Sequence, residues 1–143
     1  MREILFRGKR IDNGEWIYGG ILQTDNWSEI SVVTDYYGSM YEPPSCEVDS
    51  YEVIPETVGQ YTGLTDKNGK KIFEGDVVST DLKRPYNIVV FRDGCFMFNC
   101  NDGNQDYYDI MLPILQSEHT RYEYGEVIGN IYDNPELLRS DTE

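Results

Sequence analysis

The residue types best suited to nucleophilic or metal chemistry are scarce in this chain: one histidine, His119, and three cysteines, Cys46, Cys95 and Cys100. A structural zinc site needs four ligands, and a catalytic thiol is usually activated by a neighbouring base. Four residues separate Cys95 from Cys100, and no second ligand pair completes a zinc site. We therefore predict no catalytic residue and no bound transition metal. The alternative roles are a solvated loop position for His119 and a small core side chain for Cys95.

Two acidic, glycine-containing segments have the residue types of a calcium loop. In the first, residues 66–76, the spacing does not supply the sixth-position glycine and twelfth-position glutamate of an EF-hand, and a hairpin explains the same residues. The second, residues 101–106 with Asp109, is the better candidate for an adventitious Ca²⁺ site. The alternative interpretation of this second segment is an acidic loop whose side chains cap local turns. The glycines match no phosphate-binding loop, so we predict no cofactor.

Basic side chains are concentrated in the middle of the chain, and acidic ones dominate both ends. The formal net charge is −14, made up of −6 over residues 1–54, zero over 55–100 and −8 over 101–143. The basic residues of the neutral middle segment are Lys67, Lys70, Lys71, Lys83, Arg84 and Arg92. They could form a nucleic-acid-binding face, or simply protect strand edges. Because the acidic ends repel phosphate, we predict that the protein does not bind nucleic acid by itself.

The composition also bears on location and association. The odd number of cysteines, without a signal peptide before them, predicts free thiols in a reducing cytoplasm. No apolar run approaches the roughly 20 residues that span a bilayer, so we predict no membrane association. Twelve tyrosines against five phenylalanines fit half-buried sheets, and also fit protein interfaces.

These side chains must be positioned by β-strands, because short apolar segments dominate and helix-period patterns are scarce. Strand segments are predicted at 4–6, 15–22, 30–34, 51–54, 58–62, 77–82, 86–91, 95–98 and 126–132. Gly19-Gly20 inside the second of these indicates a bulge or a close backbone approach. An irregular connection is expected from Asp35 to Ser50, a loop over residues 99–106, and residues 107–116 are of unclear type. Asn134 and Pro135 predict one short helical turn ending near Leu138.

The turn at Asn68-Gly69 is the strongest local signal in the chain. This dipeptide favours a two-residue type I′ hairpin turn, in which both central residues have positive φ. We predict positive φ at Gly69, and a buried core supplied largely by Ile72, Phe73, Val77, Val89 and Phe91.

The predicted fold is mainly β. An N-terminal β layer, residues 1–58, is expected to pack on an SH3-like, partly open small barrel, residues 59–138. Residues 139–143 are expected to form a frayed tail. Because no flexible linker separates the two parts, we expect one folding unit.

Three parts of the chain carry a family resemblance: residues 2–7, the central block 55–64 and 66–78, and 126–132 with 134–138. In these parts the chain resembles the YopX family of phage and prophage proteins of Gram-positive bacteria. The resemblance implies a mainly β fold and brings no established activity or catalytic residues. Segments 26–50 and 99–122 are the least family-like, and protein-specific contacts are expected there.

The leading hypothesis is a non-enzymatic phage or prophage accessory protein of the host cytoplasm. It would act through contact with an unknown protein partner and as a homo-oligomer. A second hypothesis is an acidic decoy that mimics DNA and occupies a host nucleic-acid-binding protein. A third, an enzyme using paired carboxylates or a metal, would need a pocket in which carboxylates converge.

Overall fold

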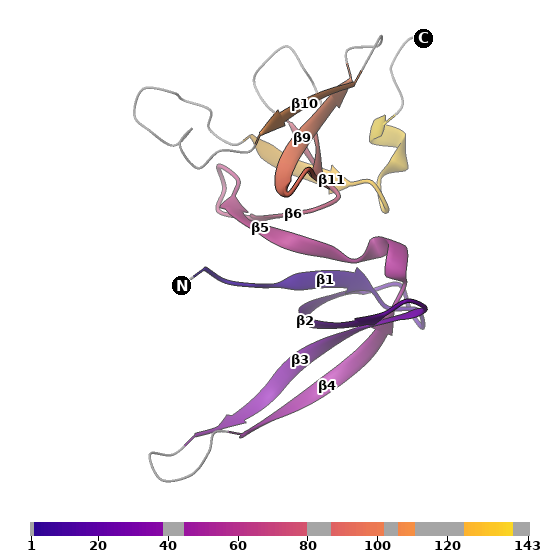
Figure 1. Cartoon of the computed structure of the whole chain (residues 1–143), viewed down its shortest axis with the longest axis vertical. Coiled ribbons are helices and arrows are strands. Elements are labelled where there is room, and N and C mark those ends of the chain that lie inside the picture. The colour runs from indigo at the N-terminus through magenta and orange to yellow at the C-terminus, as the bar shows by residue number, and fades with distance from the viewer. Residues whose placement is uncertain (1, 39–44, 80–86, 102–105, 111–124, 139–143) are drawn as a thin grey trace. The chain divides into compact units, whose positions relative to one another are not determined.

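The structure is a computed structural model that describes residues 2–38, 45–79, 87–101, 106–110 and 125–138. The described part is mainly β, as predicted, with antiparallel strands and the two short 3₁₀ turns η1 and η3. The chain divides into two compact units, residues 1–60 and 61–143 (Figure 1). The expectation of a single folding unit stays a prediction.

The first unit is an antiparallel sheet in the order β4-β3-β2-β1, with β1 also pairing with the first two residues of β5. Its elements are β1 (Phe6–Lys9), β2 (Trp16–Thr24), β3 (Trp27–Tyr37), β4 (Ser45–Val53) and the 3₁₀ turn η1 (Pro55–Thr57). Ile30 and Val53 are fully buried on the inner face of this sheet. The first strand begins later than predicted, at Phe6 rather than Ile4.

The predicted irregular connection from Asp35 to Ser50 is wrong at both of its ends. β3 continues to Tyr37, and β4 already begins at Ser45, which lies opposite Tyr37. The proline pair 43–44 lies outside the described residues. Tyrosine and β-branched residues favour the extended conformation on either side of it, and cross-strand pairing stabilises it. Figure 1 shows β3 and β4 side by side well beyond the end of β2.

The second unit contains the rest of β5, paired with β6, and a five-stranded antiparallel sheet in the order β10-β9-β8-β7-β11. Its elements are β5 (Gly59–Thr65), β6 (Lys71–Phe73), β7 (Asp76–Ser79), β8 (Asn87–Arg92), β9 (Cys95–Asn101), β10 (Asp106–Ile110), β11 (Glu126–Asn130) and the 3₁₀ turn η3 (Pro135–Leu138). The predicted short C-terminal helical turn is therefore confirmed. The described strands do not close into a barrel.

The predicted loop over residues 99–106 is wrong at both of its ends, where the structure has strands. β9 runs on to Asn101, and β10 resumes at Asp106, directly opposite it. Polar residues occupy both strand ends, because pairing with a neighbouring strand satisfies their backbone whatever their side chains are.

Four of the five predicted core residues are buried, namely Ile72, Phe73, Val77 and Val89. Phe91 is the exception, since 54% of it is exposed. It lies at the end of β8, next to the turn, where it meets its cross-strand partner Phe96 with ring centroids 5.1 Å apart. The alternation pattern gives the face of the strand on which a side chain lies, but not where the core ends along that strand.

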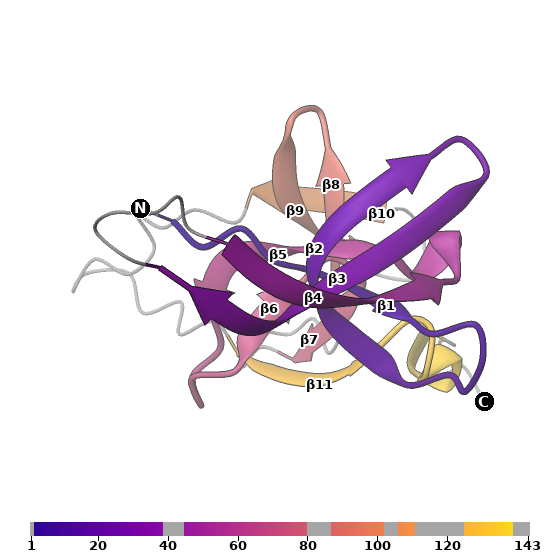
Figure 2. The same cartoon turned by 90° about the horizontal axis from the view of Figure 1, so that it is seen from below.

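The turn after β5 has positive φ at Gly69, as predicted, but it is not a type I′ turn. The Gly69 N–H donates to the Asp66 carbonyl (2.9 Å) and the Asp66 N–H to the Lys70 carbonyl (2.8 Å), which makes a longer loop. Among the described non-glycine residues only Asp93 has positive φ, so Asn68 does not. The two-residue turn with both φ positive is Asp93-Gly94, at 53° and 82°, in the β8–β9 hairpin (Figure 2).

Gly69→Val is expected to lower the free energy of unfolding by about 1–3 kcal/mol, because a β-branched side chain is disfavoured at φ +81°. A Cβ atom at this position would meet nothing within 4 Å, so a clash of that atom does not contribute to the loss. Gly69→Asn is the matched control. Asparagine tolerates the left-handed region, and its cost should stay below about 1 kcal/mol. Urea denaturation of the three proteins measures both values, and equal losses would contradict the conformational explanation.

Candidate interaction surface

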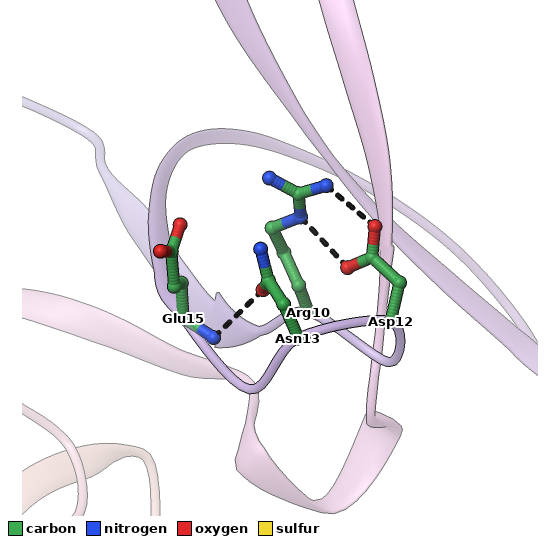
Figure 3. Close-up of polar contacts among 4 residues, drawn as sticks. All are labelled: Arg10, Asp12, Asn13 and Glu15. Carbon is green, nitrogen blue, oxygen red and sulfur yellow. Dashed lines mark hydrogen bonds and ion pairs between the residues drawn. The ribbon is translucent and has the colours of Figure 1, made fainter.

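A turn between β1 and β2 brings Arg10 to the end of β4. The Arg10 guanidinium donates two hydrogen bonds to the Asp12 carboxylate, from Nε (2.9 Å) and from a terminal nitrogen (2.5 Å), as Figure 3 shows. Asn13 Oδ1 accepts the Glu15 N–H (2.9 Å), and Gly14 has φ +73°. The hydrogen bonds between Arg10 and Asp12 raise the pKa of Arg10 and lower the pKa of Asp12. At pH 7 the turn therefore holds an ion pair, in which the Asp12 carboxylate balances the charge of the Arg10 guanidinium.

Backbone contacts from this turn cover the last residues of β4. The Ile11 N–H donates to the Glu52 carbonyl (3.1 Å), and Arg10 forms an isolated bridge with Val53. The guanidinium of Arg10 lies over the ring of Tyr51, 4.4 Å from its centroid. The outer edge of β4 is therefore closed from Tyr51 onward.

The rest of that edge, Ser45–Ser50, pairs with no strand among the described residues. We call this segment the open edge. β2 pairs with β3 only up to Ser31, so residues 32–37 and 45–49 form a ribbon of two strands, which we call the arm. A two-stranded ribbon is marginally stable in water, and an unpaired edge invites another strand.

One face of the arm is apolar and open to solvent. Val33 lies opposite Val48, and Tyr36 lies opposite Cys46. A register shift after Val33 places Tyr36 on the same face as Val33, because Cys46 and Val48 are two residues apart on β4. The exposed fractions are 58% for Val33, 66% for Tyr36 and 47% for Val48. We call these three side chains the apolar face.

The opposite face of the arm carries carboxylates. Asp35 lies opposite Glu47, and Asp49 lies opposite Val32, two residues further along β4. Asp35 accepts the Tyr37 hydroxyl (2.8 Å), and this bond raises the pKa of that tyrosine. Among the described residues, no ion pair to lysine or arginine is made by Asp35, Glu47 or Asp49. We call these three carboxylates the acidic face.

Comparison with known proteins identifies the family of this chain. The model of the YopX protein family matches residues 5–139. The chain belongs to the YopX family. A crystal structure of protein EF1440 from Enterococcus faecalis is similar, with 28% identity and a TM-score of 0.62, over 97% of this chain and 100% of that one. No curated protein matches.

In this YopX family protein two acidic residues of segment 66–76, Asp66 and Asp76, accept hydrogen bonds from the backbone. The Asp66 carboxylate, which is buried, accepts the N–H groups of Asn68 (2.8 Å), Lys70 (2.9 Å) and Val127 (3.0 Å). Burial favours the neutral acid, but these three backbone donors outweigh it and lower the pKa of Asp66. Asp76 accepts the Phe73 N–H (2.8 Å). The hairpin interpretation of this segment is confirmed.

The other candidate residues are in part outside the described residues, and those that are described have separate surroundings. His119 and residues 102–105 lie outside the described residues, as do Lys83 and Arg84. Cys46 is exposed and Cys95 is half-buried, both as free thiols. Lys71 lies over the ring of Tyr61 (5.5 Å) and Arg92 over the ring of Tyr108 (4.0 Å). Within the described ranges, no group of three His, Cys, Asp or Glu residues could hold a metal ion.

Sequence reasoning missed the arm. A signal for it was present in the alternation of Cys46, Val48 and Ser50 with Glu47 and Asp49, which is typical of a strand with one acidic face. The tyrosines and prolines nearby obscured that signal, because they are equally typical of a loop.

Proposed function

We propose that this protein is a non-enzymatic phage or prophage accessory protein of the bacterial cytoplasm that acts by binding other proteins. The observation that carries the proposal is the arm, which exposes an apolar face and an open strand edge together. Exposed apolar patches and open edges are features of protein-binding surfaces. Family membership supports the phage setting.

Self-association is the simplest form of this activity, and we propose a homo-oligomer. The twelve tyrosines support it, because tyrosine is enriched at protein interfaces. Light scattering measures the mass in solution directly against the 16.6 kDa of one chain. A mass of two or more chains at micromolar concentration is expected. A monomer that also retains no protein from host lysate would contradict an interaction function.

Binding to nucleic acid alone is not expected, because the net charge of −14 opposes every phosphate contact. In a gel-shift assay at low salt a weak complex could form through residues 67–92, and it should vanish at physiological salt. A complex with DNA that survives physiological salt would overturn this expectation. None of the helices in the described part of the chain has the length and apolar character needed to cross a membrane.

An acidic decoy of a host nucleic-acid-binding protein is the second candidate. The acidic face favours it, since Glu47 and Asp49 stand two residues apart on one side of a strand, with Asp35 opposite Glu47. Replacing all three carboxylates by their amides should then abolish binding to the host protein, and DNA should compete with this protein for the same site. Competition by DNA would favour the decoy over the plain interaction module.

A further inference from the structure

We propose that the open edge of β4 binds a strand from another protein, in which apolar and basic residues alternate. The inference rests on the proposed interaction function and specifies its site and the chemistry of its partner. An extended peptide that adds to a sheet edge gains affinity from backbone hydrogen bonds and specificity from its alternate side chains. Residues 45–50 supply an edge of that kind.

The end of the edge sets a limit on where the added strand can lie. Ile11 already donates to the carbonyl of Glu52, and Arg10 covers the ring of Tyr51. An incoming strand therefore has residues 45–50 available, which is the length of a typical strand.

The two faces of the arm determine the side chains of that strand. Residues on the side of Val48 would extend the apolar face, so they should be valine, isoleucine or an aromatic residue. Residues on the other side would stand beside Glu47 and Asp49, so they should be lysine or arginine. Because successive residues of a strand alternate between faces, the two requirements produce an alternating apolar and basic pattern.

Charge argues against a second copy of β4 as the occupant of this edge. If two β4 strands paired antiparallel with Val48 opposite the partner's Val48, Glu47 would stand opposite the partner's Asp49. Like charges directly opposite one another destabilise a strand pair. Self-association of the protein would then involve a different surface, and it would leave the open edge accessible.

A synthetic peptide of about ten residues that alternates valine and lysine, one strand in length, is the probe. Its affinity for the full chain is measured by fluorescence anisotropy. A peptide with glutamate in place of lysine, and one with the same composition in which the alternation is scrambled, are expected to bind at least about tenfold more weakly. N-methylation of alternate backbone nitrogens should abolish binding when it removes the donors that face β4.

Two variants of the protein locate the site. Val48→Lys places a charge in the middle of the apolar face and should weaken binding of the valine–lysine peptide by at least about tenfold. Since Val48 is 47% exposed, the fold should tolerate the change. Ile4→Lys is the matched control: it makes the same charge change at a residue that is 63% exposed and lies outside the arm, and it should bind normally.

A charge swap tests the pairing itself. The double variant Glu47→Lys, Asp49→Lys should lose the valine–lysine peptide and gain the valine–glutamate peptide. Failure of the wild-type chain to bind the valine–lysine peptide at millimolar concentration would overturn the proposal, as would equal binding by Val48→Lys. Light scattering of Val48→Lys separates this proposal from the proposed function. If the variant still forms an oligomer, the interaction function stands, and the peptide data alone decide whether the open edge of β4 is a binding site.

Discussion

Asp66→Ala should lower the free energy of unfolding by about 2–4 kcal/mol, because it removes a buried carboxylate that accepts three backbone N–H groups. Asn68 and Lys70 are exposed, so their N–H groups can turn to water. The N–H of Val127 is buried and would lose the Asp66 carboxylate as its acceptor. That donor lies 61 residues away in the chain, so the loss also weakens the link between the hairpin and β11. The bond from the Lys67 N–H to the Gly125 carbonyl (3.2 Å) would remain.

The controls for this prediction are Asp66→Asn and Asp25→Ala. The amide keeps one acceptor oxygen in place, so its cost should be smaller, about 1–2 kcal/mol. Asp25 is an exposed turn residue, and its replacement should change the stability by less than about 0.5 kcal/mol. Urea denaturation followed by far-ultraviolet circular dichroism measures all three. If Asp66→Ala is no worse than Asp25→Ala, the carboxylate has no structural role.

The same residue predicts a dependence of stability on pH. The folded state lowers the pKa of Asp66 below its ordinary value of 3.8, so its ionised form stabilises the fold at neutral pH. This contribution is present above the unfolded pKa and is lost as the pH falls through the folded pKa. The difference in stability between the wild type and Asp66→Asn should therefore shrink below about pH 4. A difference that stays constant down to pH 2 would show that the charge is not the cause.

Asp66→Ala also tests whether the two units fold together. Both tryptophans, Trp16 and Trp27, lie in the first unit, whereas Asp66 lies in the second. If the chain is one folding unit, tryptophan fluorescence and circular dichroism should report the same lowered midpoint. A fluorescence midpoint that remains at the wild-type value would show that the units unfold separately.

Gly19→Ala should lower the free energy of unfolding by about 2–4 kcal/mol, because there is no room for a side chain at this position. A Cβ atom there would collide with the backbone carbonyl oxygen of Ser31 and would lie 3.3 Å from Cγ2 of Ile30. Backbone atoms of a paired strand cannot move aside as a flexible side chain can. The change should therefore disturb the pairing of β2 with β3.

Gly20→Ala is a closely matched control, since it is the next residue in the same strand. A Cβ atom at Gly20 would meet nothing within 4 Å. This variant should be neutral or should stabilise the protein by up to about 1 kcal/mol, because it reduces the freedom of the unfolded chain. Tryptophan fluorescence during urea denaturation measures both variants. Equal stability of the two alanine variants would contradict the close approach at Gly19.

The sequence by itself determined the features that depend on neighbours along the chain. The strands around 15–22, 30–34 and 58–62 follow from alternation and β-branched residues, and the bend at Gly69 follows from a glycine that can adopt positive φ. The close approach at Gly19-Gly20 was one of two alternatives, and the contact of Gly19 with Ser31 identifies it. Family membership is likewise a property of the sequence, because it rests on the order of residues.

The tertiary structure decided what depends on partners far apart in the chain. Asp66 is a residue type that can bind a cation. Only the tertiary structure places the N–H of Val127 beside it, and this contact shows that its carboxylate accepts hydrogen bonds from the backbone. Phe91 has the pattern of a core residue, but the sheet extends past the core at that point, so the ring stays exposed. The open edge of β4 depends on which strands lie beside it. The sequence of residues 45–50 does not indicate whether another strand pairs with them. The hydrogen bonds between strands are made by backbone groups, which every sequence shares.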